Sequence, residues 1–441
     1  MSIALRNCRF VVDAPSPSEV RVREGIDIVI ENGIITCVGE CRDIATGIEE
    51  IDCGNYVAIP GLGNAHTHAA MVVLRGYADD YELFDWLPRV WRAERFLTPS
   101  IIEHATAIAC MEMASCGTTA FQDMYFFPEK VVEIAQSFGL RIRTGPIAGM
   151  HRVEDLKHWL SMRSKLFEPV INIHSIYALD LETLETWFGA SKDLGIDVHI
   201  HLSETRRELY ICRKKLGFFP VEFLEKRGWL SERIVGVHLN WVTSWEIEYL
   251  AKRRARVVVN PSNGAKLAVG GFTPVKEMIS RGIVVGLGTD GACSSNKLSV
   301  LNEMRMLVLL YRHSYWDTEL RASHALYIAT KGSYQAMGFR GGLVEPGYVG
   351  DIVLLNLRSL RMYPPTRKRV GSHVVYAAEC SDVVYTIVGG RIVWSPNHVE
   401  RFAKELEWRS RQLESYVALS DGLAEEKELS EEPPWRRGSE T

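Results

Sequence analysis

From Val57 the chain reads Val-Ala-Ile-Pro-Gly-Leu-Gly-Asn-Ala-His-Thr-His and reaches His68. The apolar start is typical of a buried strand, and it leads directly into two histidines at alternate positions, His66 and His68. Because residues i and i+2 of a strand point to the same face, both imidazoles should project together. The intervening Pro-Gly-Leu-Gly is not a solvated surface segment. We therefore expect a functional pair at a strand end rather than two unrelated surface histidines.

Seven further strand candidates follow this stretch, and helical patterns separate most of them, for example at residues 99–115 and 181–194. Together with the first, these strands are expected to end at Pro60, Gln122, Thr144, Ile173, Ile200, Val237, Val259 and Leu287. Eight such units over about 280 residues are typical of a (β/α)8 barrel, whose active site lies at the carboxyl ends of its strands. We predict an α/β fold with a TIM barrel over residues 58–344. A doubly wound open sheet, the alternative, would not spread functional residues over so many strand ends.

The two ends of the chain carry short strand patterns of a different kind. Residues 1–57 alternate apolar and polar positions, with an Asn32-Gly33 turn between two of the runs, and similar runs return in residues 345–400. We expect both segments to assemble into one small β-sandwich. Residues 401–441 are predicted to form a C-terminal helix followed by a disordered tail, because the last residues are charged and poor in apolar side chains.

Composition excludes several classes of function. The chain has 441 residues, of which 46% are hydrophobic and 24% charged, and 51 Lys+Arg stand against 55 Asp+Glu. This balance provides no basic surface for nucleic acid or membrane, and no apolar run approaches the ~18 residues of a membrane helix. The first residues lack the apolar core of a signal peptide, so we expect a cytoplasmic protein. The nine cysteines form no C-x-x-C pair and are expected to be reduced thiols rather than zinc ligands.

Three more strand ends carry residues suited to metal chemistry. The fifth strand ends in His199-Ile-His201-Leu-Ser-Glu204, the sixth at His238, and the eighth in Gly-Leu-Gly-Thr-Asp290-Gly. Three imidazoles and a carboxylate form a normal ligand set for catalytic zinc or iron(II), with one position left for water. His199 points inward one layer deeper than His201, and we expect it to be a hydrogen-bonded interior residue or a support for the ligands.

The last of these motifs also spells a dinucleotide fingerprint, Gly286-x-Gly288-x-x-Gly291. It lies at the last barrel strand rather than in the first βα unit, and Asp290 would repel a pyrophosphate. We therefore expect these glycines to let the backbone pass close to a metal.

Taken together, these motifs resemble the amidohydrolase superfamily, and within it the 5′-methylthioadenosine/S-adenosylhomocysteine deaminase and chlorohydrolase group. The resemblance covers residues 1 to about 400 and rests on Pro60-Gly-x-x-Asn-x-His-Thr-His68, His201-x-x-Glu204, His238 and Gly288-Thr-Asp290-Gly291. It implies one divalent metal per subunit, zinc with iron as the alternative, on four ligands: His66, His68, His201 and Asp290. Glu204 would be the general acid/base, and His238 would orient and deprotonate the attacking water.

Physical chemistry supports these roles. A bound cation brings the pKa of water down toward ~7, so hydroxide forms at neutral pH and can attack an electron-poor ring carbon. Glu204, three residues past a ligand, would carry the proton to the ring nitrogen and then to the leaving amine.

The same resemblance implies substrate contacts. In the group, a Trp and a Glu after the first strand contact the nucleoside, with the Glu on the ribose hydroxyls, and here Trp86 and Glu94 correspond to them. His174 matches the substrate histidine of the fourth strand, Glu204 would also touch the substrate, and Arg152 is a candidate for binding a substrate carboxylate. The arginine that the group often carries after the third strand is absent at Thr144-Gly145, and the seventh strand reads Asn-Pro-Ser-Asn instead of His-Asn-Pro-x-Ser-Asn. These departures affect the expected binding of the homocysteine part of S-adenosylhomocysteine. They do not affect the expectation that the substrate is a 5′-modified adenosine.

The predicted function is a metal-dependent hydrolytic deaminase of 5′-modified adenosines that releases ammonia and the inosine analogue. The alternative is a triazine or other N-heterocycle amino- or chlorohydrolase with the same fold. A non-catalytic scaffold would have lost ligands that are present here, and a binuclear hydrolase of cyclic amides would need a bridging lysine where the chain has His174. The expected partner is a small molecule, without nucleic acid or membrane, and a homo-oligomer is compatible with the sequence.

Overall fold

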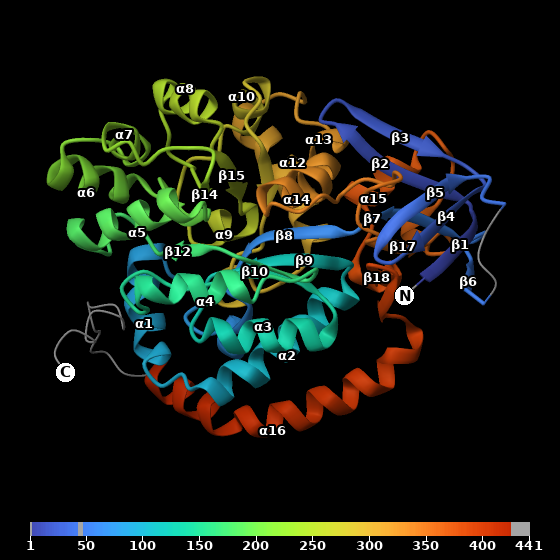
Figure 1. Ribbon diagram of the computed structural model, residues 1–441, viewed down its shortest axis with the longest axis horizontal. Helices are drawn as coiled ribbons and strands as arrows, with labels where there is room; N and C mark the ends of the chain where they lie inside the picture. Colours follow the sequence, from blue (N-terminus) through green and yellow to red (C-terminus); the bar gives the residue numbers. More distant parts are fainter. Residues whose placement is uncertain (1, 43–46, 425–441) are drawn as a thin grey trace.

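The computed structural model describes residues 2–42 and 47–424 (Figure 1). A parallel barrel fills the middle of the molecule, and two antiparallel-rich sheets built from both ends of the chain lie at one side of it. The predicted disordered tail falls on residues 425–441, which lie outside the described residues. No described helix is both long and apolar enough to cross a membrane.

The barrel strands are all parallel, and backbone hydrogen bonds join them in the orders β8-β9-β10-β11 and β12-β13-β14-β15-β16. Their bounds are β8 (Leu62–Thr67), β9 (Thr118–Asp123), β10 (Arg141–Thr144), β11 (Phe167–Pro169), β12 (Ile171–Ile173), β13 (Val198–Leu202), β14 (Ile234–His238), β15 (Arg256–Val259) and β16 (Val285–Leu287). The short strands β11 and β12 are two halves of the fourth barrel strand, separated by Val170, whose N–H donates to Thr144 O at 3.1 Å. Beyond β16 the chain returns to β8, where Thr289 and Asp290 both donate to His66 O at 3.1 Å. The predicted TIM barrel is confirmed.

Helices surround the barrel, so its strands are buried on both faces (Figure 1). The helices predicted at 99–115 and 181–194 are confirmed with these bounds: Asp180 caps the second through Thr183 N (2.7 Å), and Gly195 ends it with a φ of +70°. The α-helices are α1 (Leu83–Glu94), α2 (Pro99–Ser115), α3 (Pro128–Phe138), α4 (Leu156–Ser161), α5 (Leu181–Leu194), α6 (Arg206–Leu216), α7 (Pro220–Lys226), α8 (Ser244–Arg253), α9 (Pro261–Lys266), α10 (Val275–Ser280), α11 (Ala292–Ser295), α12 (Val300–Tyr315), α13 (Ala322–Tyr327), α14 (Ser333–Ala336), α15 (Val370–Tyr376) and α16 (Val399–Ala424).

Two terminal sheets lie beside the barrel. The first, β5-β4-β1-β6, uses N-terminal strands, and the second, β19-β18-β17-β7-β2-β3, combines strands from both ends of the chain. Their bounds are β1 (Ser2–Cys8), β2 (Phe10–Ser16), β3 (Glu19–Arg23), β4 (Ile26–Glu31), β5 (Ile34–Gly39), β6 (Glu49–Asp52), β7 (Tyr56–Pro60), β17 (Ile352–Asn356), β18 (Val383–Val388) and β19 (Arg391–Trp394). Apolar side chains of both sheets, among them Ile3, Ile28 and Leu354, share one buried cluster.

One strand prediction is wrong. The run that ends at Pro60 belongs to the terminal sheet as β7, where it pairs antiparallel with β17 and parallel with β2. The first barrel strand is β8, which begins two residues later. Pro60 has no N–H to continue a ladder, and the next N–H, that of Gly61, donates to Asp351 O at 2.8 Å. The chain therefore leaves one sheet and enters the other across Pro60 and Gly61, although the apolar run itself continues.

The cysteine prediction is also wrong in part. Cys37 pairs with Cys41, and Cys116, at the end of α2, pairs with Cys380 from the C-terminal segment. The second pair is 264 residues apart in sequence but only 4.2 Å apart between Cα atoms, so sequence spacing could not indicate it. The other cysteines are free and buried: Cys8, Cys53, Cys110, Cys212 and Cys293.

Candidate active site

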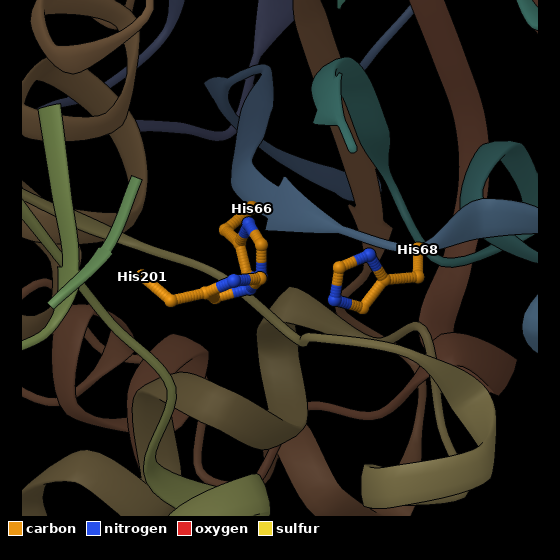
Figure 2. A group of neighbouring side chains, drawn as sticks. All are labelled: His66, His68 and His201. Atoms are coloured by element: carbon orange, nitrogen blue, oxygen red, sulfur yellow. The ribbon is translucent and has the colours of Figure 1, made fainter. Parts of the chain in front are cut away.

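The two histidines of the opening motif meet a third at the carboxyl end of the barrel. His66 and His68 lie at the end of β8, and His201 lies on β13 with its Nε2 atom 3.2 Å from His66 Nε2. The three imidazoles point toward one common position (Figure 2). One nitrogen from each lies within 4.8 Å of the others, so the group could hold a metal ion. The predicted pairing of side chains i and i+2 at this strand end is present.

Asp290 faces the same position from the end of β16. Its Oδ1 atom lies 3.3 Å from His66 Nε2 and 3.1 Å from His68 Nε2. Burial opposes ionisation of this carboxyl group, but its contacts with His66 and His68 outweigh that effect and hold its pKa well below the usual range. The site therefore offers an ionised carboxylate beside imidazoles, which is the donor chemistry of zinc and iron sites.

The backbone around Asp290 explains the glycines that resemble a nucleotide fingerprint. A Cβ at Gly288 would lie 2.7 Å from His66 O and 2.4 Å from the Asn260 side chain, and a Cβ at Gly291 would lie 2.4 Å from Met71 Sδ. Asp290 itself has a φ of +60°. Gly288 allows the chain after β16 to pass against His66 of β8, where the barrel closes, and Gly291 leaves room for Met71.

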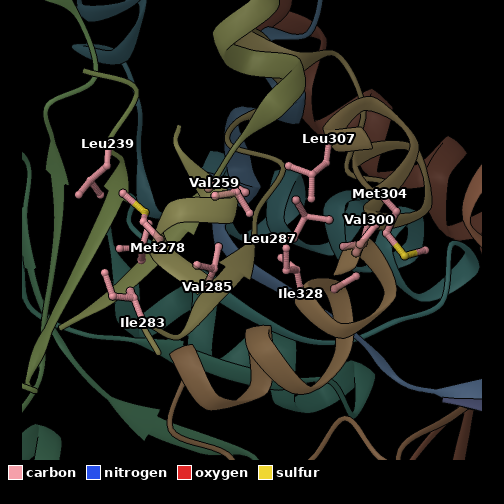
Figure 3. Close-up of a cluster of buried hydrophobic side chains, with 14 of the residues drawn as sticks. Leu239, Val259, Met278, Ile283, Val285, Leu287, Val300, Met304, Leu307 and Ile328 are labelled. Atoms are coloured by element: carbon pink, nitrogen blue, oxygen red, sulfur yellow. The ribbon is translucent and has the colours of Figure 1, made fainter. Parts of the chain in front are cut away.

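A buried apolar cluster holds β16 in this position (Figure 3). Val285 and Leu287 of β16 pack with Val300, Met304 and Leu307 of α12, and all are essentially inaccessible to solvent. Each fully buried side chain of this size contributes about 1.5–3 kcal/mol. Asp290 lies three residues beyond this packed strand, and its own N–H donates to His66 O at 3.1 Å, so the carboxylate is tied to both β16 and β8.

Each histidine of the cluster is oriented by a contact of its second nitrogen. His68 Nδ1 contacts Met124 O at 2.5 Å, His201 Nδ1 contacts His174 O at 2.8 Å, and His66 Nδ1 contacts His199 Nε2 at 2.8 Å. The Nε2 atoms are therefore left to face the common position. Burial lowers the pKa of His66 and His201, which favours the neutral imidazoles that metals bind. His199 is a buried, hydrogen-bonded interior residue, as its position along the strand indicates.

Glu204 and His238 stand next to this cluster. Glu204 Oε1 lies 3.6 Å from His238 Nε2 and accepts a hydrogen bond from Asn263 Nδ2 at 3.2 Å. Burial raises the pKa of Glu204 well above its usual range, and the charge of Asp290 adds to the effect. Burial also lowers the pKa of His238 to about 3. In the amide orientation that pairs every hydrogen-bonding group around it, Asn260 accepts from His238 Nδ1 at 3.2 Å through its side-chain oxygen. Its side-chain nitrogen donates to Val259 O and Gly288 O.

Glu208 supports this corner and was missed at the sequence level. Its two carboxylate oxygens accept from the N–H groups of Ser203 (3.0 Å) and Glu204 (2.7 Å), and it is buried. Thr205 Oγ1 in turn accepts from Glu208 N at 3.1 Å. The Thr-x-x-Glu pattern at residues 205–208 is typical of a helix start and could have indicated a carboxylate directed back at this backbone.

The cluster opens into a pocket of about 810 Å³, its open mouth included. Of the residues predicted to contact substrate, Trp86, Glu94, His174 and Glu204 all line it. Arg152 does not: its side chain is 79% exposed and its Nε atom lies 3.5 Å from Glu154. It lies on the segment that leads into α4, where its guanidinium faces solvent and a neighbouring carboxylate, and its contact with a substrate carboxylate stays a prediction.

Three carboxyl groups line the described pocket: Asp290 of the cluster, the adjacent Glu204, and Glu94, which lies apart from both. Glu94 stands at the end of α1, is 5% exposed, and accepts a hydrogen bond from Tyr125 Oη at 2.8 Å. Burial raises its pKa to about 7. Tyr125 was missed at the sequence level, since no local pattern connects it with a residue 31 positions earlier.

Comparison with known proteins agrees with this geometry. The chain matches the Amidohydrolase family over residues 57–393. A 5′-deoxyadenosine deaminase of Methanothrix thermoacetophila is 35% identical over 90% of this chain and 96% of its own. A 5-methylthioadenosine/S-adenosylhomocysteine deaminase of Pyrococcus furiosus is 35% identical over 83% of this chain and 90% of its own.

Among solved structures, an adenosine deaminase of Xanthomonas campestris with bound zinc superimposes with a TM-score of 0.87 at 26% identity. The match covers 95% of this chain and 98% of that one. The family match extends over most of the chain, and the barrel and the cluster at its strand ends agree with it. The chain therefore belongs to the amidohydrolase family.

Proposed function

We propose that this protein is a metal-dependent hydrolytic deaminase of 5′-modified adenosines, which converts them to the inosine analogue and ammonia. One observation carries the substrate class: the buried carboxylate of Glu94 lies in an otherwise apolar wall of the pocket that opens from the cluster. A carboxylate in such a place can accept hydrogen bonds from a ribose diol. The names of the relatives from Methanothrix and Pyrococcus support the same class. The cytoplasm remains the predicted compartment.

We propose that one divalent cation, zinc with iron as the alternative, binds in the cluster. Its ligands would be His66, His68, His201 and Asp290. The donor set fits, because the imidazoles are oriented through their Nδ1 atoms and the carboxylate is ionised. When bound, such a cation supplies Lewis acidity and a water that ionises near neutral pH.

The remaining steps belong to the side chains beside the cluster. Asn260 engages Nδ1 of His238, so Nε2 of this neutral imidazole is left as an acceptor for the proton of the attacking water. Glu204, whose pKa is raised, holds a proton that it can deliver to the ring nitrogen as the ring carbon is attacked. Now a carboxylate, Glu204 takes up the hydroxyl proton of the tetrahedral centre and passes it to the amine, which leaves as ammonia while the carbonyl forms. The proton held by His238 then returns to Glu204, 3.6 Å away. Asn263 keeps Glu204 in place through its amide.

Binding of the nucleoside would use the pocket walls. Glu94 would accept from the two ribose hydroxyls, and Trp86 would offer a flat apolar surface. His174 is neutral, because burial lowers its pKa to about 3, and its Nδ1 contacts Ser175 Oγ at 3.2 Å. Its ring would form a polar contact with the bound molecule in the pocket.

Glu94→Ala is expected to erase the preference for ribose-bearing substrates. A site built to hold hydroxyl groups rejects analogues that lack them, because its buried polar groups are left unpaired. In the wild-type protein, 5′-deoxyadenosine or 5′-methylthioadenosine should exceed a 2′,3′-dideoxy analogue or free adenine in kcat/KM by about 10²-fold or more. The measurement is ammonia release over a panel of nucleosides, free bases and triazines.

The matched control is Tyr125→Phe, which removes one hydrogen bond to Glu94 but keeps the carboxylate, and should retain most of the preference. If the wild-type protein hydrolyses triazines well and ignores every nucleoside, the nucleoside assignment is wrong and the alternative function stands.

His199→Ala is expected to weaken metal binding by about 10–100-fold, the usual effect of losing a group that orients a metal ligand. The reason is its contact with His66 Nδ1, which selects the orientation of that ring. Zinc affinity measured by chelator competition tests this. His104→Ala is the control, since His104 is also a buried histidine but contacts Arg409 instead. Equal zinc affinity in the two variants would contradict the role of His199.

A further inference from the structure

Apart from the histidine imidazoles, the only ionisable side chains that could carry charge on the described pocket wall at neutral pH are carboxyl groups. Among the described residues that line it, the carboxyl groups are those of Glu94, Glu204 and Asp290, and no lysine or arginine is present. The rest of the wall is mainly apolar, with Leu83, Leu87, Val90, Phe126, Ile147 and Met150 among its members. An anionic group inside this pocket would therefore meet no fixed positive side chain.

Two arginines from neighbouring segments do not change this result. Arg152 is 79% exposed and lies beside Glu154. Arg207, on α6, stacks its guanidinium 4.3 Å from the ring centroid of Phe84 and is exposed, outside the lining of the pocket. Carboxylates that proteins bind tightly are usually held by charge-assisted hydrogen bonds, most often from arginine. That kind of partner is missing from the described wall.

We infer that this pocket selects adenosines whose 5′ substituent is uncharged, such as hydrogen or a short alkylthio group, over those that carry an amino acid. This inference rests on the proposed function and makes its substrate more specific. It does not depend on where along the wall the substituent lies, because outside the imidazoles no described residue of the wall supplies a cation. A zwitterionic amino acid that enters the pocket gives up water and gains no charged partner for its carboxylate.

The test compares two thioethers of similar size. S-adenosylhomocysteine carries an ammonium and a carboxylate, whereas 5′-butylthio-5′-deoxyadenosine keeps the sulfur and the carbon chain without them. The butylthio compound should exceed S-adenosylhomocysteine in kcat/KM by about 10²-fold, the scale of one unmet charged hydrogen-bonding group. Equal values would overturn the inference, because the amino acid would then remain in water. Equally poor values for both, relative to 5′-methylthioadenosine, would also overturn it in favour of a limit on length.

A failure of the proposed function can be told apart from a failure of this inference. If no nucleoside releases ammonia, the deaminase assignment fails. Equilibrium dialysis of the same two thioethers against the metal-loaded protein still compares their affinities, and a preference for the butylthio compound would support the apolar selection by itself.

A gain-of-function variant tests the physical cause. Met150 lines the pocket and is 38% exposed, so a longer charged side chain can be placed there without being buried. Met150→Arg should raise kcat/KM for S-adenosylhomocysteine relative to the butylthio compound by about 10-fold, through a pair with the carboxylate. Met150→Gln, of similar length but neutral, is the matched control. If both variants give the same ratio, the missing cation is not the cause of the selection.

Discussion

Replacing His201 by Ala is expected to remove both the bound metal and the ammonia-releasing activity. His201 presents Nε2 to the common position of the cluster, 3.2 Å from His66 Nε2, and no other described imidazole points there from β13 in its place. A catalytic cation contributes several kcal/mol to the transition state, so the rate should fall by about 10³-fold or more. The measurements are elemental analysis of the purified variant and ammonia release at saturating substrate. Asp290→Ala should behave in the same way.

Metal content of the unchanged protein completes this test. Close to one zinc or iron ion per chain is expected, because the two groups of converging ligands among the described residues, His66-His68-His201 and His66-His238-Asp290, share His66. Two tightly bound ions per chain would point to a binuclear centre and contradict the proposal. Recovery of full activity in His201→Ala after added zinc would show that this imidazole is not required as a ligand.

Glu204→Gln is expected to lower kcat by at least about 10²-fold while metal content stays unchanged, the usual scale for a lost general acid/base. Glutamine keeps the size of the side chain and can still hydrogen-bond to Asn263, but it cannot carry a proton. The measurements are kcat, zinc content and the affinity for a 5′-modified adenosine. If turnover is near normal, the proton travels by another route, and His238, 3.6 Å away, is the next candidate.

The variant also separates two explanations of a lower rate. If Glu204 only shapes the pocket, the conservative change should alter KM and leave kcat in place. If it transfers protons, kcat should fall while binding is retained.

The predictions that succeeded rest on local periodicity. Alternation placed the imidazoles of His66 and His68 on one face of a strand. Because Glu204 follows His201 by three residues in sequence, its carboxyl group was expected just beyond the end of another strand. Helix patterns at 99–115 and 181–194 matched the observed helices because capping residues mark their ends. These features depend on residues a few positions apart, and a single sequence contains that information.

The predictions that failed depend on which segments become neighbours. The apolar run at Val57–Pro60 is equally suited to a barrel strand and to the terminal sheet, and its pairing with β17, some 290 residues later, decides the matter. The solvent-facing position of Arg152, just before α4, likewise depends on neighbouring segments and not on local pattern. The same holds for the disulfide between Cys116 and Cys380.

By itself, the sequence determined the barrel class and the strand ends that carry the histidines and the carboxyl groups of the cluster, because strand periodicity and side-chain chemistry are local properties. Only the tertiary structure decided that Tyr125 holds Glu94, that His199 orients His66, and that no described cation lines the pocket. These are contacts between residues of different strands and helices. Their distances are set by closure of the barrel and packing of the core, which act on the whole chain at once.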